Sequence, residues 1–321
     1  MPQRKRLIVA SPRGFCAGVR HAIEIAEVAL RVFPHPVYCL KELVHNPYVL
    51  DELRTKGMVF VRQLSEVPEG ATVVISAHGV SPTIYAEAEA RHLRVIDATC
   101  PFVRKVHEEV RRFALAGYTI LLIGHRDHDE VVGVVGEAPE RVIVVEKCEA
   151  VPGITVPDPQ RVAVVTQTTL SPDEAAGILE LLRARFPALV TPPASDICYA
   201  TINRQDAVKR LARTVQTILV LGAENSSNAR RLVEVARACG VQSHLVSDVA
   251  QLATLPLADR EIVGLTAGAS TPESFVERAI DALAPLGFEN VEYMTLVEEA
   301  VHFALPKALR DRLRELHHSP P

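Results

Sequence analysis

Three cysteines, each standing just before a predicted helix and each in a different third of the chain, most strongly constrain the fold. Cys16 lies in RGFCAGVRHAIEIA, Cys100 in DATCPFVRKVHEEV and Cys198 in SDICYATINRQDAV. In each case an apolar or turn segment leads to the cysteine, and an amphipathic helical pattern follows it. The recurrence of this unit predicts three similar modules rather than one continuous sheet.

Strand and helix patterns alternate along the chain, which predicts the α/β class. Several strand patterns are continuous apolar runs, as expected for parallel strands that are buried on both faces. The expected strands are 6–11, 36–40, 72–77, 119–124, 142–146, 162–167, 217–222 and 261–268, and helical patterns include 19–33, 101–117, 171–186 and 227–240.

The later two cysteines also suggest where the modules divide. A boundary is expected before each of them, and the Pro-rich stretch LVTPPASD resembles a linker at the second boundary. We therefore predict a first α/β domain at 14–97, a second at 98–193 and a third at 194–287, which a strand in 1–13 completes. A C-terminal tail follows at 288–321, which begins like a strand and continues as one or two helices.

Composition narrows the function classes. The 321 residues are 48% hydrophobic and 23% charged, as in an ordinary globular protein. The net charge is −4 with dispersed basic residues, which argues against a nucleic-acid partner. The apolar stretch near the N-terminus is too short for the apolar core of a signal peptide. No run approaches the ~20 apolar residues of a membrane span. We expect a cytoplasmic protein with no membrane partner, in which cysteines are ligands or core thiols rather than disulfides.

The position of the three cysteines favours metal binding. The positive end of a helix dipole stabilises a thiolate, and the thiolate is the form that binds metal. Three thiolates from three similar units suggest a soft-metal site, with an iron–sulfur cluster and zinc both as candidates. A single cysteine is more often an inert buried thiol, and this is our interpretation of Cys39, Cys148 and Cys239, which lack the helix-start context.

Polar side chains follow several of the expected strands, where ligands collect in parallel α/β sheets. Short hydroxyl and amide groups beside helix N-termini form a good anion site, and diphosphate is a plausible ligand. No Walker A pattern and no G-x-G-x-x-G follows a strand, so a nucleotide is not indicated. The candidates are His78, His125, His128, Glu130, Thr168, Ser226, Ser227, Asn228 and Ser270, together with His45 before a helix that starts at Pro47.

Each of these residues also has a purely structural interpretation. Any single histidine can cap a helix or fill space, and NSSN by itself is usually an N-cap run. His125 is the weaker candidate beside His128, because it lies closer to the buried strand. Glu130 could simply favour the dipole of a helix start, but next to His128 we favour a role as an acid catalyst.

Eight motifs occur in the order of a known family, from about residue 7 to about residue 300: GFCAGV, HNPYV, SAHGVSP, DATCPFV, TQTTLS, DICYAT, NSSN and TAGAS. The chain resembles the 4-hydroxy-3-methylbut-2-enyl diphosphate reductases, which catalyse the last step of the non-mevalonate isoprenoid pathway. The resemblance implies three similar α/β modules in a trefoil arrangement around a central iron–sulfur cluster. It also implies a [4Fe–4S] cluster that is bound by Cys16, Cys100 and Cys198. The fourth iron of this cluster is open to substrate, and oxidative loss of that iron leaves a [3Fe–4S] cluster.

The resemblance also assigns roles to the strand-end residues. Those that match the family's substrate-binding residues are His45, His78, His128, Thr168, Ser226, Ser227, Asn228 and Ser270. Residues matching Glu130, His128 and Thr168 lie near the allylic hydroxyl and on the proton path. The implied reaction is the reductive dehydroxylation of (E)-4-hydroxy-3-methylbut-2-enyl diphosphate to isopentenyl and dimethylallyl diphosphates. An external one-electron donor such as ferredoxin or flavodoxin would supply the electrons.

Two positions depart from the family pattern. Asp129 stands where proline is common, and Val134 replaces a common threonine. If the two carboxylates face each other, Asp129 raises the pKa of Glu130, whereas it does little if the helix turns it outward.

Three other function classes fit part of the sequence. A zinc hydrolase would place the three cysteines around one ion and would be insensitive to oxygen. A non-catalytic iron–sulfur sensor would not need the strand-end polar residues. A small electron carrier would need neither 321 residues nor an anion site.

Overall fold

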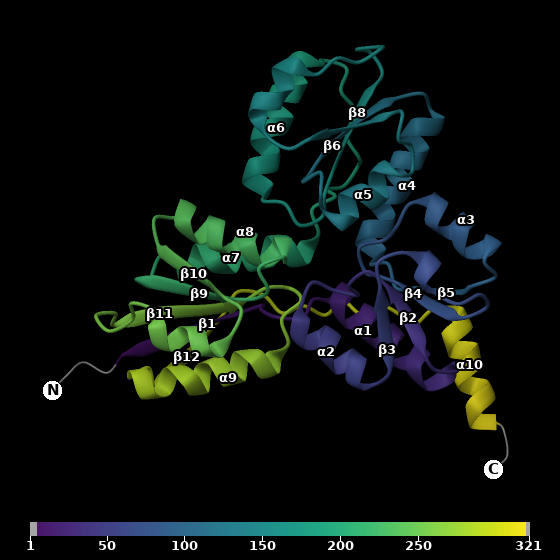
Figure 1. Cartoon of the computed structure of the whole chain (residues 1–321). Helices are drawn as coiled ribbons and strands as arrows, with labels where there is room; N and C mark the ends of the chain where they lie inside the picture. Colours follow the sequence, from purple (N-terminus) through teal and green to yellow (C-terminus); the bar gives the residue numbers. More distant parts are fainter. Residues whose placement is uncertain (1–4, 319–321) are drawn as a thin grey trace. The chain divides into compact units, whose positions relative to one another are not determined.

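Twelve strands, all paired in parallel, form three separate sheets in the computed structural model, which describes residues 5–318. Helices connect successive strands in each sheet (Figure 1). The expected α/β class is thus confirmed, because parallel strands need such crossover connections.

The first sheet has five strands in the order β10-β9-β11-β1-β12. Its strands are β1 (Arg6–Ser11), β9 (Thr217–Leu221), β10 (Gln242–Val246), β11 (Ile262–Ala267) and β12 (Asn290–Thr295). The helices α7 (Tyr199–Leu211) and α8 (Ser227–Ala238) pack together on one face, and α9 (Glu273–Leu283) lies on the other side in Figure 1. The N-terminal strand therefore completes a sheet whose other strands all lie beyond residue 216.

The second sheet has four strands in the order β3-β2-β4-β5. Its strands are β2 (Val37–Leu40), β3 (Met58–Val61), β4 (Thr72–Ile75) and β5 (Arg94–Asp97). The helices in the same stretch of chain are α1 (Ala17–Val32), α2 (Pro47–Thr55) and α3 (Pro82–Ala90). The central strand β4 is wholly buried, and the side chains around it form one apolar cluster.

The third sheet has three strands in the order β7-β6-β8. Its strands are β6 (Thr119–Ile123), β7 (Val142–Val145) and β8 (Val162–Thr166), and its helices are α4 (Pro101–Leu115), α5 (Asp129–Val135) and α6 (Pro172–Arg185). The chain ends in α10 (Lys307–His318), and single 3₁₀ turns lie at 64–66, 148–153, 249–254 and 284–286.

The chain divides into two compact units. The first comprises the N-terminal residues up to Ala17, residues 45–47 and Tyr199–Val301, and contains the five-stranded sheet. The second comprises Gly18–Val44, Tyr48–Cys198 and the residues from His302 onward, and contains the other two sheets. The domain boundaries expected at residues 97, 193 and 287 stay a prediction.

All eight expected strands are present, and the strand-like start of the tail is β12; three further strands, β3, β5 and β10, were not expected. Each of the four lies at the edge of its sheet. The unexpected strands β5 (RVID) and β10 (QSHLV) mix polar with apolar side chains and so lack a continuous apolar run, whereas β3 (MVFV) is apolar but only four residues long. Within residues 5–318, no helix is both long and apolar enough to cross a membrane.

The packing of α7 on the first sheet gives a test of the fold. Gly264 lies in β11 between Ile8 and Ile218, and a Cβ atom there would be 2.6 Å from Leu211 Cδ2 of α7. Overpacking of this kind typically costs about 1–3 kcal/mol, so Gly264→Ala should lower the urea midpoint of unfolding. Gly153→Ala is the matched control, because an added Cβ there meets no atom within 4 Å. An equal loss in both variants would contradict the packing of α7 on β11.

Candidate functional site

The three predicted cysteine ligands have the same local geometry. Each is the residue just before a helix: Cys16 before α1, Cys100 as the N-cap of α4 and Cys198 before α7. The backbone N–H of each donates to a carbonyl that follows a parallel strand: Cys16 to Ala269 at 3.1 Å, Cys100 to Ala77 at 3.0 Å and Cys198 to Thr168 at 3.1 Å. Each acceptor is, or directly precedes, a residue predicted to bind substrate. The strand ends and the cysteine loops are therefore joined by one repeated contact.

The thiols of these three cysteines suit a soft metal. All six cysteines lie within the described part of the chain and none forms a disulfide. The three predicted ligands are partly exposed, whereas Cys39 is buried in β2, where burial raises the pKa of its thiol. Cys39 is thus a core thiol, as expected. Cys148 is partly exposed and Cys239 exposed, and neither lies in a cysteine loop of the kind described above.

In the first unit, hydroxyl and amide groups gather at the start of α8. Ser226 is the N-cap of α8, and its Oγ accepts from the Ala229 N–H at 3.3 Å, so the structural interpretation of NSSN is also correct. Asn228 Oδ1 accepts from the Ala269 N–H at 2.8 Å, so the side-chain amide nitrogen, Nδ2, is the group that could donate to a ligand. That Nδ2 is buried and has no hydrogen-bond partner among residues 5–318. A buried donor of this kind is costly unless a ligand accepts from it.

Two further predicted residues meet in the same unit. Ser270 Oγ donates to the His45 carbonyl at 2.9 Å, so the residue after Ala269 is tied to the HNP segment. Ser226, Ser227, Asn228 and Ser270 are all less than a tenth exposed. The first unit therefore brings together Cys16, His45 and the predicted hydroxyl and amide donors, next to the helix dipole of α8.

In the second unit, Glu130 is a buried acid held by Thr168. The Thr168 N–H donates to Glu130 Oε1 at 2.7 Å, and Thr168 Oγ1 donates to Oε2 at 2.9 Å. The side chain is only 2% exposed. Burial raises the pKa of Glu130 to about 7, although both bonds from Thr168 act in the opposite direction. A carboxyl group with such a pKa can hold a proton near neutral pH and release it, as an acid catalyst must.

His128 lies beside this acid at the start of α5. It is the N-cap of the helix, and its Nδ1 accepts from the Glu130 N–H at 3.1 Å. Because Nδ1 accepts, a proton of the neutral ring sits on Nε2. The rings of His128 and His78 meet edge to face, with centroids 5.7 Å apart. The second unit thus brings together His78, His128, Glu130 and Thr168.

The unusual residue Asp129 does not face Glu130. Its carboxylate binds Lys41 Nζ at 2.5 Å, and burial rather than Asp129 is the main cause of the raised pKa of Glu130. Lys41 follows β2 with a φ of 60°, a left-handed conformation that is uncommon outside glycine. Of the two expected outcomes for Asp129, the structure has the one in which the helix turns it away.

Sequence reasoning missed two residues that hold these loops. Gln167 is 1% exposed; its Oε1 accepts from the His125 N–H at 3.0 Å and its Nε2 donates to Thr169 at 3.0 Å. The backbone N–H of His125 thus helps to hold the loop, and we assign no function to its side chain. Asp196, two residues before Cys198, accepts from the Thr166 N–H at 3.1 Å and from Lys105 at 2.9 Å. Gln167 lies in the motif TQTTLS and Asp196 in the motif DICYAT. Their structural roles were not predicted because the sequence does not show that these polar side chains are buried.

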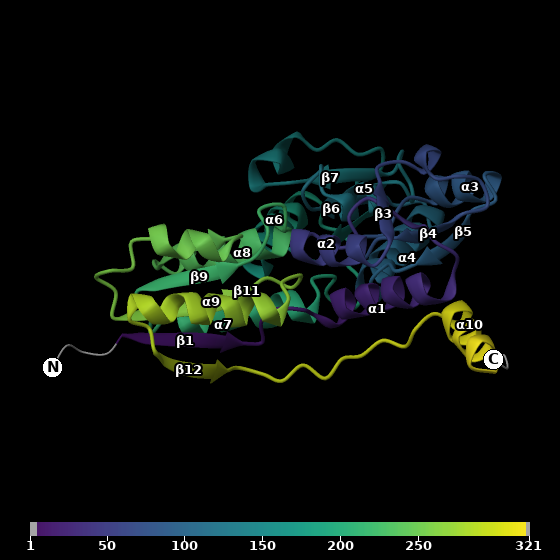
Figure 2. The ribbon, with the colours of Figure 1, turned by 60° about the horizontal axis from the view of Figure 1, so that its bottom comes forward.

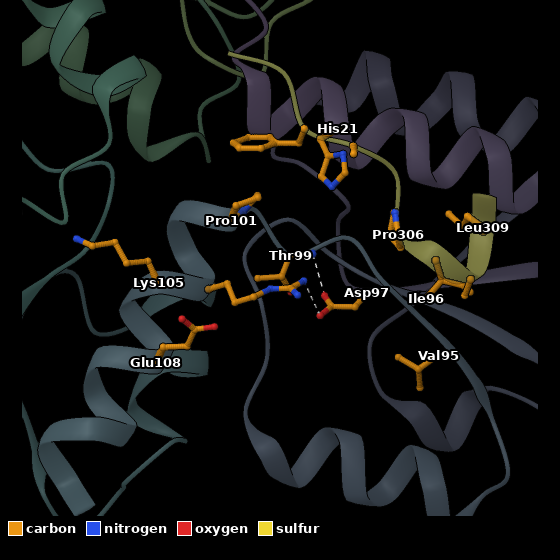
Figure 3. Close-up of a pocket in the computed structure, with 14 residues that line it drawn as sticks. His21, Val95, Ile96, Asp97, Thr99, Pro101, Lys105, Glu108, Pro306 and Leu309 are labelled. Atoms are coloured by element: carbon orange, nitrogen blue, oxygen red, sulfur yellow. Dashed lines mark hydrogen bonds and ion pairs between the residues drawn. The ribbon is translucent and has the colours of Figure 1, made fainter. Parts of the chain in front are cut away.

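The turn before Cys100 is fixed by one carboxylate (Figure 3). Asp97 accepts from the Thr99 N–H at 2.9 Å and from Arg104 at 3.0 Å. A cavity of about 510 Å³ lies next to this turn, between α1, β5, α4 and the C-terminal segment around Pro306 and Leu309. None of the predicted site residues lines this cavity, so it is separate from the groups described above.

Comparison with known proteins gives the family. A family model described as LytB protein matches residues 7–284. A curated 4-hydroxy-3-methylbut-2-enyl diphosphate reductase of Acidothermus cellulolyticus is 50% identical over 97% of this chain and 92% of that protein. One of Aromatoleum aromaticum is 50% identical over 95% of this chain and 98% of that protein. The solved E-1-hydroxy-2-methyl-but-2-enyl-4-diphosphate reductase of Plasmodium falciparum is 36% identical, with a TM-score of 0.95 over 98% of this chain and 99% of that one.

The structural match confirms the fold class that the resemblance implied. The sequence match extends over nearly the whole length of the curated relatives as well as of this chain. The chain therefore belongs to the LytB family, whose relatives named above are 4-hydroxy-3-methylbut-2-enyl diphosphate reductases.

Proposed function

We propose that this chain catalyses the reductive dehydroxylation of (E)-4-hydroxy-3-methylbut-2-enyl diphosphate to isopentenyl and dimethylallyl diphosphates. The observation that best supports this reaction is the buried Glu130 held by Thr168, with a pKa of about 7. The reaction breaks the allylic C–O bond with two electrons and two protons, one proton going to the departing oxygen and one to carbon. Water is a far better leaving group than hydroxide, so the first proton needs an acid such as Glu130.

Cys16, Cys100 and Cys198 would hold an iron–sulfur cluster. The fit rests on three partly exposed thiols, each at a helix start and each in a loop fixed by the same backbone contact. Three protein ligands suit a [4Fe–4S] cluster with one open iron, which can also occur as [3Fe–4S] after oxidation. When bound, the cluster would supply the electrons one at a time and a Lewis acid for the substrate oxygen.

The substrate would bind the polar residues that follow the strands, as the resemblance implies. In the first unit these are His45, Ser226, Ser227, Asn228 and Ser270, and the buried Asn228 Nδ2 supports an acceptor ligand there. In the second unit His78, His128 and Thr168 would contact the substrate. A neutral His128 with its proton on Nε2 can donate to an oxygen, and Thr168 can relay the proton of Glu130.

The electrons would come from an external one-electron donor such as ferredoxin or flavodoxin, because none of the residues described stores two electrons. We also propose a cytoplasmic location. It is supported by the six cysteines, none of which is in a disulfide within the described chain.

The first prediction concerns the ligands. Cys16→Ser, Cys100→Ser or Cys198→Ser should each abolish cluster loading and turnover, because a hydroxyl is a poor ligand for iron. Cys148→Ser and Cys239→Ser should leave both nearly intact. Iron and sulfide are counted per chain after anaerobic reconstitution. A fourth cysteine ligand, or a zinc-loaded active protein without sulfide, would contradict the open-iron mechanism.

The second prediction concerns the diphosphate. Asn228→Ala removes a donor that would bind substrate before and during the reaction, so it should mainly weaken binding. Loss of one hydrogen bond to a charged group costs roughly 1.5–3 kcal/mol, or about ten- to a hundredfold in affinity. Calorimetric titration of the oxidised holoenzyme with substrate measures this loss, and Ser247→Ala, at a partly exposed serine of the same unit that is not a predicted substrate contact, is the control. Unchanged affinity in Asn228→Ala would show that the anion site is misassigned.

The third prediction separates binding from proton delivery. Glu130→Gln keeps the size and hydrogen-bonding capacity of the side chain but removes its acidic proton. We expect cluster content and substrate affinity to survive while turnover falls by two or more orders of magnitude, in the range of general acid catalysis (~10²–10⁴). Near-normal turnover in Glu130→Gln would show that another residue is the acid catalyst. Loss of the cluster in this variant would show that the role of Glu130 is structural.

The same variant tests the titration of Glu130. The pKa is raised from 4.5 to about 7 on folding, so the folded state binds the proton more tightly than the unfolded state. Wild-type stability should therefore fall as the pH rises from about 4.5 to about 7, and Glu130→Gln should lack this component. Urea unfolding of the cluster-free chains at several pH values measures it. Parallel pH profiles for the two chains would contradict the assignment.

A further inference from the structure

Arg204 is a fully buried cation in α7, with 0% of its surface exposed. Its guanidinium donates twice to the Gly14 carbonyl, from Nε at 3.2 Å and from Nη2 at 2.8 Å. Nη1 donates to the Ala200 carbonyl at 3.0 Å and to the carboxylate of Glu299 at 3.0 and 3.2 Å. A planar five-donor group can hold all these acceptors at once, which a lysine cannot.

Glu299 neutralises this buried charge. Its side chain is only 7% exposed, and it also accepts from Asn203 Nδ2 at 3.1 Å. It lies in the segment that follows β12 without helix or strand (Figure 2). The segment lies beyond residue 284, where the match to the family model ends, and within the predicted C-terminal tail at 288–321. A buried ion pair seldom adds net stability, so its presence needs another explanation.

The residue that Arg204 holds is a fixed point of the Cys16 loop. Gly14 has a φ of +63°, and a Cβ atom there would be 3.0 Å from the Thr271 carbonyl. The Gly14 N–H donates to the Ala267 carbonyl at 3.2 Å, and two residues later the Cys16 N–H donates to Ala269 at 3.1 Å. The backbone N–H groups of Gly14 and Cys16 are therefore held by residues at and just after the end of β11, and the carbonyl of Gly14 is held by Arg204.

We propose that Arg204 and Glu299 are a positioning pair that fixes the Cys16 loop for cluster binding, which makes the segment after β12 part of the metal site. This inference rests on the proposed role of Cys16 as a ligand. Residues that orient a metal ligand without touching the metal commonly change metal affinity by roughly ten- to a hundredfold when they are replaced. The pair is a positioning pair and not a catalytic one, because Arg204 bonds the loop backbone at Gly14 and Glu299 acts on the loop only through Arg204.

The test measures cluster retention in the reconstituted holoenzyme under anaerobic conditions. The rate of iron release to a ferrous chelator is compared for wild type, Glu299→Gln and Glu292→Gln. Glu292 is the matched control, because it pairs with Arg6 between β12 and β1 in the same unit but has no contact with the Cys16 loop. The urea midpoint of each cluster-free chain reports any general loss of stability.

We expect Glu299→Gln to release iron at least about tenfold faster than wild type, and Glu292→Gln to release it at the wild-type rate. The urea midpoint of the cluster-free Glu299→Gln chain should fall further than that of Glu292→Gln, because the buried Arg204 loses its partner, whereas Glu292 belongs to a half-exposed pair. Gly264→Ala is therefore a second control: its added Cβ meets Leu211 and Val215 rather than the Cys16 loop, so it lowers the midpoint of the same unit but should release iron near the wild-type rate. Arg204→Lys keeps the positive charge but not the fork of donors, so it should release iron as fast as Glu299→Gln and serves as the second variant if that chain does not fold.

Two results would overturn the inference. Wild-type iron release in both Glu299→Gln and Arg204→Lys would show that the pair does not position the loop. Equally fast release in Gly264→Ala, at a similar loss in the urea midpoint, would make the pair a general stabiliser of the unit. If wild type itself binds no cluster, the proposed function fails first, and that outcome is recognised from its iron content alone.

Discussion

One backbone contact, repeated three times, underlies the candidate site. Each cysteine amide donates to the carbonyl of a residue just past the end of a parallel strand. Parallel strands end at one edge of their sheet, and helices begin at that edge, so this contact places a thiol where helix dipoles and loop donors already gather. The residues after those strands, Ser270, His78 and Thr168, are the predicted substrate contacts. The position of each ligand and of its neighbouring substrate residue is thus set by the same hydrogen bond.

Burial then determines what the acid in the second unit can do. An exposed glutamate would be ionised at neutral pH and could not deliver a proton. Glu130 is buried at the start of α5, and two donors from Thr168 prevent its pKa from rising further. Asp129, the neighbouring charge, is paired with Lys41 and leaves this balance alone. The charge of Asp129 is therefore balanced within the same unit.

The sequence was informative where a residue's environment follows from its neighbours in the chain. Buried strands such as β9 and β6 appear as apolar runs, and the cysteines stand visibly before helices. The edge strands β5 and β10 were missed because their side chains are mixed in polarity, and only their pairing with an inner strand makes them strands. The roles of Gln167 and Asp196 were missed for a related reason, since a polar residue next to a motif gives no sign of its burial.

The α/β class, the three cysteines at helix starts, the polar residues that follow the strands and the family can all be recognised from the amino-acid sequence. These depend on local patterns and on motifs in a fixed order, which one chain displays in full. Which groups meet depends on the three-dimensional fold: Glu130 contacts Thr168, 38 positions away, Lys41 contacts Asp129, 88 positions away, and Arg204 contacts Gly14, 190 positions away. Burial and charge pairing arise from such distant contacts, so the pKa of Glu130 and the support of the Cys16 loop have no counterpart in any local pattern.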